Sequence, residues 1–222
     1  MKEVRNILKE AVIFDLDGVI VSTDEYHYKA WKRIADEENI YFDAQINQKL
    51  RGVSRLESLE IILEKTDKTY TIQEKENLAQ RKNNYYRELL KDLTPQDILP
   101  GVINLLNILK KKSIKIAIGS SSKNTGAILK KIGLDAMFDA VVDGNQIKNS
   151  KPDPEVFLLA AKALGVEASN CAVVEDADAG IKAALAAEMK AVAVGDAQSN
   201  MNSSYRLSDL AKVDINKLLE DV

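Results

Sequence analysis

Short apolar runs alternate with segments of helical periodicity over much of the chain. Five runs, each of three to five residues, end at Gly, Ser, Asp or Glu, and this pattern is typical of buried strands: they span residues 11–14, 114–118, 140–142, 172–174 and 191–194. Between them, apolar residues recur at helical spacing over 102–112, 127–132, 154–164 and 180–187. This alternation predicts an α/β protein with a doubly wound parallel sheet covered by helices on both faces.

One long segment interrupts the alternation. From residue 23 to 93 no run is typical of a strand, and helices are predicted over 26–38, 55–64 and 72–90. The segment begins just after the first strand and ends near Thr94 and Pro95. We interpret residues 22–93 as a helical cap inserted into a core formed by residues 1–21 and 94–222; a plain helical layer within one domain is the alternative.

Composition narrows the classes of function. The chain has 222 residues, with 31 Lys and Arg against 34 Asp and Glu, so its net charge of −3 gives no reason to expect nucleic acid or an anionic membrane as a partner. No apolar run approaches the roughly 18 residues that span a bilayer. The lone cysteine, Cys171, lies in a strand-like run and is expected to be a small buried residue. We therefore expect a cytoplasmic, monomeric protein that acts on a small molecule.

Polar residues gather at the predicted carboxyl ends of the strands, where doubly wound sheets bind ligands. Asp15, Asp17, Ser120, Glu175 and Asp176 follow strands, and Lys151 precedes the helix that starts near residue 154. Clustered carboxylates repel one another unless a cation neutralises them, and hard oxygen ligands suit magnesium. We predict a magnesium site formed by Asp15, Asp17, Glu175 and Asp176.

The spacing within Phe14-Asp15-Leu16-Asp17-Gly18 suggests a role for each carboxylate. Asp15 can attack phosphorus to form an aspartyl phosphate, and Asp17 can protonate the leaving oxygen and deprotonate the incoming hydroxyl. Ser120 and Lys151 would hold the oxygens of the transferring group. An isolated Asp-x-Asp-Gly is also a common turn, so the interpretation depends on the other strand-end residues.

These motifs resemble the four motifs of the haloacid dehalogenase superfamily, in the expected order. They are the segment 14–19, the strand that ends at Ser120, Ser150-Lys151-Pro152-Asp153-Pro154, and Glu175-Asp176-Ala177-Asp178-Ala179-Gly180. The resemblance implies a Rossmann-like core, a helical cap and an aspartyl-phosphate intermediate formed with magnesium.

A closer resemblance is to the β-phosphoglucomutase family, which interconverts β-glucose 1-phosphate and glucose 6-phosphate through bound β-glucose 1,6-bisphosphate. Segments 25–31, 52–55, 81–83 and 120–124 carry it. By this resemblance, Arg55, Ser122, Lys123 and Asn124 would hold the phosphate that is not reacting, and the other substrate-binding residues would be His27, Trp31, Gly52, Val53, Ser54 and Lys82. An arginine can bind a phosphate with two hydrogen bonds, and the backbone N–H groups at a helix start favour anions, so both suit such a site. The chain departs from the family at Ser22, where relatives carry an acidic residue, and at Ala177 and Asp178.

Several alternatives remain at this point. His27 could position Asp17 or a sugar hydroxyl, or be an ordinary polar helix residue; Trp31 could serve packing alone, Lys82 could lie on a solvated face, and Asp178 could cap the following helix. A phosphatase for sugar phosphates is the second candidate function; a dehalogenase and a non-enzymatic binding module are weaker ones. Cap closure, with hinges near Ser22 and Pro95, is expected to assemble the site and expel water.

Overall fold

The sheet of the computed structural model, which describes residues 8–220, has six parallel strands in the order β3-β2-β1-β4-β5-β6. The strands on either side of β1, which are β2 and β4, pair with it along its whole length. The strands are β1 (Ala11–Phe14), β2 (Lys115–Gly119), β3 (Ala140–Val142), β4 (Cys171–Glu175), β5 (Lys190–Val194) and β6 (Tyr205–Leu207).

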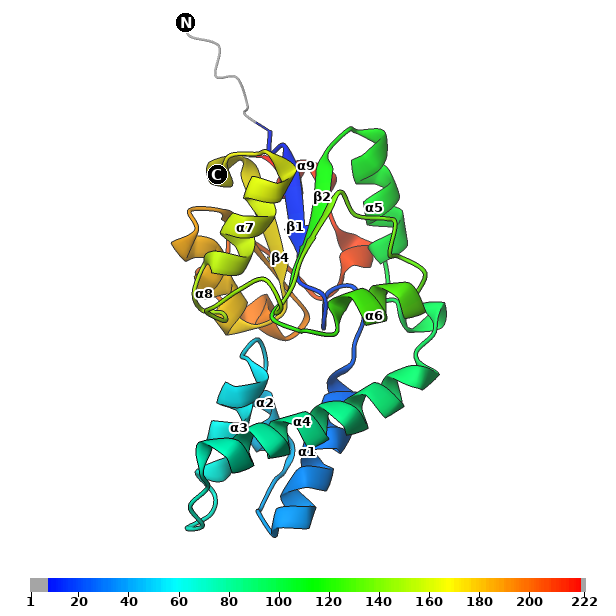
Figure 1. Cartoon of the computed structure of the whole chain (residues 1–222). Helices are drawn as coiled ribbons and strands as arrows, with labels where there is room; N and C mark the ends of the chain where they lie inside the picture. The colour runs from blue at the N-terminus through cyan, green and yellow to red at the C-terminus, as the bar shows by residue number, and fades with distance from the viewer. Residues whose placement is uncertain (1–7, 221–222) are drawn as a thin grey trace, which may run out of the picture.

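Side chains of the central strand alternate between two hydrophobic clusters. Val12 and Phe14 pack in a cluster with residues of α5 (Val102–Lys111), α6 (Thr125–Lys131) and α9 (Ile215–Leu219). Ala11 and Ile13 belong to a second cluster with residues of α7 (Glu155–Leu164) and α8 (Asp178–Ala186). Helices therefore cover both faces, and the doubly wound α/β fold predicted from the sequence is confirmed (Figure 1).

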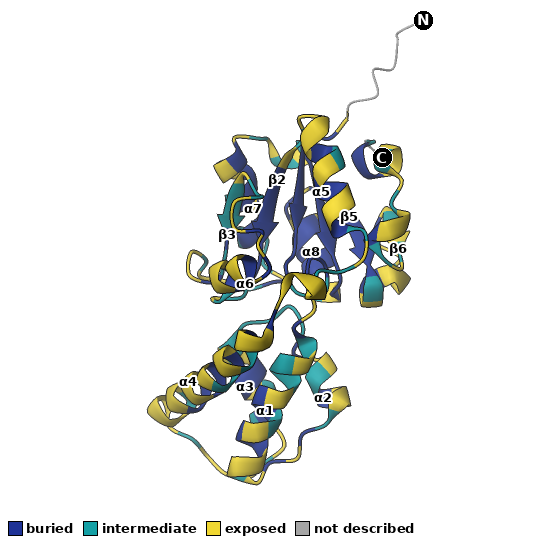
Figure 2. Cartoon of the chain, turned by 90° about the vertical axis from the view of Figure 1, so that its right-hand side faces the viewer, coloured by how far each residue is buried: buried dark blue, intermediate teal, exposed yellow. Residues whose placement is uncertain are grey.

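The second group of helices lies beyond the carboxyl ends of the strands (Figure 1). It comprises α1 (Asp24–Glu38), α2 (Ala44–Gln48), α3 (Arg55–Leu63) and α4 (Ile72–Leu89), here called the cap. Its apolar residues form a third cluster around Trp31, Ile34 and Leu59, while the outer side of α4 is exposed (Figure 2). Capping boxes at Ser54 and Thr71 fix the starts of α3 and α4 by satisfying backbone N–H groups that a helix leaves free.

The chain leaves the core and returns to it at neighbouring points. Val21 forms an isolated antiparallel bridge with Ile98, and the Leu99 amide donates to the Ile20 carbonyl at 2.9 Å. Two 3-10 turns, Leu90–Asp92 and Pro95–Asp97, carry the returning chain. The remaining 3-10 turns are Ala168–Asn170, Gly195–Ser199 and Leu210–Lys212.

Some local expectations need correction. The sequence did not predict α2, α9 or β6: the two helices have five residues each, too few to show a helical repeat, and β6 is half-exposed. Asp178 is not the cap of α8: Ala177 holds that position, and the Asp178 carboxylate instead accepts from the Asn200 side chain at 2.7 Å. Cys171 is fully buried, as predicted. Within residues 8–220, no helix is long and apolar enough to cross a membrane.

Candidate active site

A buried lysine joins two of the predicted acidic residues. Asp15 follows β1 and Glu175 ends β4, and the Lys151 ammonium lies 2.5 Å from one carboxylate oxygen of each. Lys151 is 1% exposed, and Phe157 packs with its ring centroid 4.7 Å from the ammonium. Burial alone would lower the pKa of Lys151, but the two carboxylates outweigh it and raise the pKa, so Lys151 is a permanent cation.

The positive charges near this cluster do not offset the burial and mutual repulsion of its carboxylates. Burial raises the pKa of Asp15 to about 7; Lys151 opposes this shift, and Glu175 adds to it. Burial, Glu175 and Asp15 raise the pKa of Asp176 to about 9, against the opposing charge of Arg51. A divalent cation between Asp15 and Asp176 would favour both ionised forms.

Hydrogen bonds divide the four predicted metal ligands into two pairs. Both Asp17 oxygens accept from Thr23, and the Glu175 oxygens accept from Lys151 and from the Ala177 amide. Asp15 Oδ2 and the Asp176 carboxylate accept no hydrogen bond from residues 8–220. Within the same residues, no group of three or more His, Cys, Asp or Glu side chains is arranged to hold a metal by itself. Magnesium usually takes one or two carboxylates plus water and phosphate oxygens. The donor set therefore fits magnesium held by Asp15 and Asp176.

A glycine in the Asp-x-Asp-Gly segment permits this arrangement. Gly18 has φ +82°, and a Cβ there would lie 2.0 Å from Asp176 Oδ2. Any side chain at this position would therefore displace the Asp176 carboxylate.

Asp17 faces the cap rather than Lys151. Thr23 donates to it twice, from its amide and from its hydroxyl, both at 2.6 Å. His27 Nε2 lies 3.6 Å from Asp17 Oδ2, and Lys82 Nζ lies 2.7 Å from His27 Nδ1. Burial, Lys82 and Arg55 lower the pKa of His27 well below its usual value, so the ring is neutral and accepts from Lys82. The Nε2 proton of His27 then points toward Asp17.

Burial raises the pKa of Asp17, while the Thr23 hydrogen bonds and the positive charges of Arg51 and Lys82 oppose the shift. A carboxyl group whose pKa is raised while donors hold it in place suits general acid and base catalysis.

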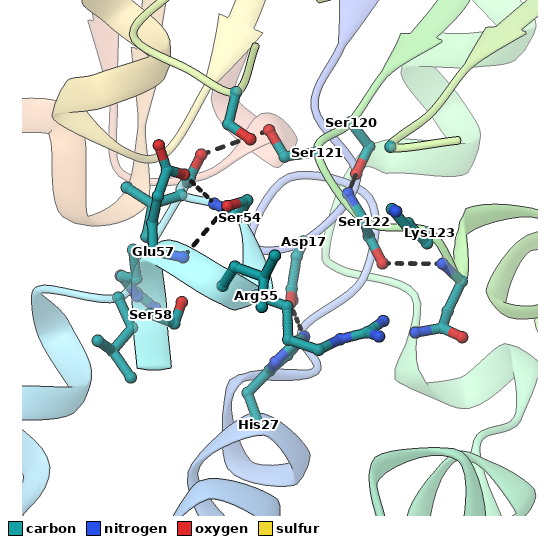
Figure 3. A pocket seen from close by; sticks show the side chains of 18 of the residues that line it. Asp17, His27, Ser54, Arg55, Glu57, Ser58, Ser120, Ser121, Ser122 and Lys123 are labelled. Atoms are coloured by element: carbon teal, nitrogen blue, oxygen red, sulfur yellow. Dashed lines mark hydrogen bonds and ion pairs between the residues drawn. The ribbon is translucent and has the colours of Figure 1, made fainter. Parts of the chain in front are cut away.

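Opposite the acidic cluster lies a set of groups suited to an anion. The Ser122 amide donates to Ser120 Oγ at 3.1 Å, and the Asn124 amide donates to Ser122 Oγ at 3.2 Å, which folds the loop before α6. Arg55, the first residue of α3, points across toward the loop that carries Ser122 and Lys123 (Figure 3). Neither Arg55 nor Lys123 has an acidic partner among residues 8–220, and burial lowers the pKa of Arg55. Two cations without counter-charges favour an incoming anion.

One cavity of about 630 Å³ connects the two sets. It is lined by all the predicted site residues except Lys151, which lies behind Asp15 and Glu175: Asp15, Asp17, His27, Trp31, Gly52, Val53, Ser54, Arg55, Lys82, Ser120, Ser122, Lys123, Asn124, Glu175 and Asp176. Trp31 and Lys82 are each 2% exposed, so both also serve the packing of the cap, with the Lys82 ammonium 4.9 Å from the Trp31 ring. The Ser54 hydroxyl accepts from the Glu57 amide and so fixes the start of α3.

Among the cavity-lining residues that sequence reasoning missed, Asn83 and Arg51 connect the cap with the core. Asn83, on α4, accepts from the Asn124 side chain at 3.0 Å and thereby links cap and core. Arg51 forms ion pairs with Asp24 of the cap and Asp196 of the core, and lies 3.7 Å from Asp176. Their basic or amide character alone gave no signal, because their partners lie 27 to 145 residues away along the chain.

Known proteins with similar sequences and folds identify the family of this chain. The family model for haloacid dehalogenase-like hydrolases matches residues 9–188. The chain is 44% identical to a β-phosphoglucomutase of Bacillus subtilis, over 96% of this chain and 95% of that protein. It is 33% identical to a phosphorylated carbohydrates phosphatase of Thermotoga maritima, over 82% and 83%. The crystal structure of a β-phosphoglucomutase from Clostridium difficile matches it with a TM-score of 0.88, at 42% identity over 93% of both chains.

Proposed function

The chain belongs to the haloacid dehalogenase-like hydrolase family, and we propose that it is a β-phosphoglucomutase. It would interconvert β-glucose 1-phosphate and glucose 6-phosphate with bound β-glucose 1,6-bisphosphate as the intermediate. The observation that carries the proposal is that two sets of residues line one cavity: Asp15, Ser120 and Asp176 on one side, with Lys151 behind them, and Arg55, Ser122, Lys123 and Asn124 on the other. A bisphosphate needs both sets, whereas hydrolysis of a small phosphate ester needs only the first.

The residues support a two-step transfer. An Asp15 oxygen forms a bond to phosphorus while the bond from phosphorus to the sugar oxygen breaks, and Asp17 supplies the proton that this oxygen takes up. In the reverse direction, Asp17 removes a proton from the sugar hydroxyl that attacks the aspartyl phosphate. Lys151 and Ser120 stabilise the transferring group, and Arg55, Ser122, Lys123 and Asn124 hold the other phosphate.

Asp15 and Asp176 would hold magnesium, which would offset the negative charges of Asp15 and of the phosphate group. Asp17 and Glu175, the other two predicted ligands, are held beside the site by hydrogen bonds; Asp17 would move the proton and Glu175 would hold Lys151 in place. We further propose that the enzyme works as a monomer in the cytoplasm on a free sugar phosphate, with no nucleic-acid or membrane partner.

A coupled assay tests the proposal. Purified protein receives β-glucose 1-phosphate, a trace of β-glucose 1,6-bisphosphate and magnesium, and glucose 6-phosphate is followed over time. We expect isomerisation that stops when a chelator is added and resumes with magnesium. Release of glucose and inorganic phosphate without glucose 6-phosphate would instead support the phosphatase alternative, which the similarity to the Thermotoga maritima phosphatase favours.

A further inference from the structure

Tyr86 of α4 is a buried residue that the mechanism above does not use. It is 1% exposed, and its hydroxyl oxygen lies 2.8 Å from Thr23 Oγ1, which is itself 2.6 Å from Asp17 Oδ2. Thr23 is also 1% exposed, and neither residue lines the main cavity. Tyr86 therefore reaches the site only through another side chain.

The direction of this hydrogen-bond chain follows from the donors available. An ionised carboxylate only accepts, so the single hydroxyl hydrogen of Thr23 goes to Asp17. The Thr23 oxygen is then an acceptor for the Tyr86 O–H group. Burial and the charge of Asp17 raise the pKa of Tyr86 well above its usual value, so the tyrosine keeps the proton that it donates.

The ring of Tyr86 also supports the second side chain that faces Asp17. It packs against the His27 imidazole with ring centroids 4.1 Å apart and an angle of 37° between the planes. The Lys82 ammonium lies 4.9 Å from the centroid of the Tyr86 ring. One aromatic side chain thus contacts both groups, Thr23 and His27, that flank Asp17 Oδ2.

We propose that Tyr86 is a positioning residue for Asp17, whose carboxylate it orients for proton transfer through the Thr23 hydroxyl. This proposal rests on the proposed function, in which Asp17 gives a proton to the reacting oxygen or takes one from it. Hydrogen bonds in such a chain polarise one another, so the outer bond strengthens the inner one. Thr23 directly precedes α1 and Tyr86 belongs to α4, so these hydrogen bonds fix the Asp17 side chain of the core relative to the cap.

The first test replaces Tyr86 by Phe, which removes the hydroxyl and keeps the ring on His27. We expect kcat to fall about 2- to 10-fold, the value of one neutral hydrogen bond, with KM changed less than twofold. Tyr85→Phe is the matched control, because its hydroxyl bonds to Glu37 at 3.0 Å in an exposed position. A Tyr86→Phe variant with the kcat of the Tyr85→Phe variant would overturn the proposal.

The second test removes or keeps the intermediate hydroxyl. In a Thr23→Val background the Tyr86→Phe change should have no further effect on kcat, whereas in a Thr23→Ser background its effect should return. A purely structural role of Tyr86 does not depend on the Thr23 hydroxyl. Equal losses in the two backgrounds would therefore contradict the proposal.

The third test uses the leaving group. When Asp15 takes a phosphoryl group from a hexose phosphate, the bond from phosphorus to the sugar oxygen breaks and that oxygen needs the Asp17 proton. When acetyl phosphate is the donor, acetate leaves without one. In single-turnover phosphorylation, Tyr86→Phe should slow transfer from β-glucose 1-phosphate and leave transfer from acetyl phosphate unchanged; equal slowing would refute the role.

These outcomes are separable from the proposed function. A wild-type enzyme that phosphorylates Asp15 but forms no glucose 6-phosphate would refute the mutase activity alone. The comparison of Tyr86 variants would still apply, because proton transfer to the first leaving oxygen precedes any isomerisation.

Discussion

Asp15 and Asp17 are separated by one residue, yet they have different partners. Asp15 is bonded to Lys151 of the core, whereas Asp17 is bonded to Thr23 and faces His27 of the cap. The first environment suits a nucleophile beside a fixed positive charge, and the second suits a group that exchanges protons.

Replacing each aspartate by asparagine should separate these roles. Asp15→Asn should abolish turnover and phosphorylation, because an amide is a very poor nucleophile here. Asp17→Asn should lower kcat by about 100- to 10,000-fold, the usual contribution of general acid–base catalysis. Mass spectrometry of the protein and steady-state assays measure the two effects.

Asp36→Asn, an exposed change on α1, is the control and should leave both unaffected. Undiminished turnover by the Asp15→Asn protein would refute its assignment as nucleophile.

Cys171 should be chemically inert in the folded protein. Burial raises the pKa of its thiol to about 11, and the side chain is fully buried in β4. Because the thiolate reacts, and at pH 8 only about one thiol in a thousand would be ionised, we expect no alkylation by iodoacetamide in buffer. Rapid alkylation should follow unfolding in urea. Rapid labelling under native conditions would show that β4 opens readily.

The sequence predicted that Asp15, Asp17, Ser120, Glu175 and Asp176 lie close together because they stand at or just after the ends of strands, and the structure places all five at one cavity. Arg51 escaped notice for the opposite reason. Its three acidic partners, Asp24, Asp176 and Asp196, come from separate segments that only the folded chain brings together.

At the scale of elements, a clear pattern of apolar residues was sufficient to predict a helix or strand, and a weak pattern was not. The strands β1 to β5 and the helices α5 and α7 lie within one or two residues of their predicted bounds, because most of their apolar residues pack into the two hydrophobic clusters of the core. The three residues of β6 are half-exposed at the edge of the sheet, and nothing in Tyr205-Arg206-Leu207 distinguishes a strand from a turn.

Two helical glycines should respond oppositely to the same substitution. In α6, a Cβ at Gly126 would meet nothing within 4 Å, so Gly126→Ala should stabilise the protein by about 0.5–1 kcal/mol. In α8, a Cβ at Gly180 would lie 1.9 Å from Glu175 Oε1, so Gly180→Ala should destabilise it by about 1–3 kcal/mol.

Urea unfolding of the two variants measures both changes in the free energy of unfolding. Gly180→Ala should also impair turnover, since Glu175 would lose its place beside Lys151. A gain of stability at Gly180 equal to that at Gly126 would show that Glu175 moves aside at little cost.

At the scale of the whole molecule, Arg51 holds the cap against the core. Its partners lie on both sides of the cavity, Asp24 on the cap and Asp176 and Asp196 on the core. Ion pairs between partly exposed groups weaken as salt screens them. The distance between cap and core should therefore depend on ionic strength and on this cation, beside the uncharged hydrogen bond between Asn83 and Asn124.

Replacing Arg51 by Met should let the cap move away from the core. Small-angle scattering of the metal-free variant should give a larger radius of gyration than the wild type, and high salt should expand the wild type toward the variant. Arg33→Met is the control, because Arg33 pairs with Glu37 within α1 and crosses no boundary. Equal radii for the wild type and the Arg51→Met protein at low salt would contradict this role.

The bridge between Val21 and Ile98 has a consequence for how such an enzyme diversifies. The chain departs from the core and rejoins it at one place, and the cap has a hydrophobic cluster of its own. Insertions, deletions or wholesale exchange between these two points leave the strand register and the Asp15–Lys151 pair untouched. Exchange of this segment would, however, replace Thr23, His27 and Tyr86 around Asp17. Under the proposed function, a new cap would therefore inherit the nucleophile and its lysine from the core, but it would have to bring its own partners for the group that moves the proton.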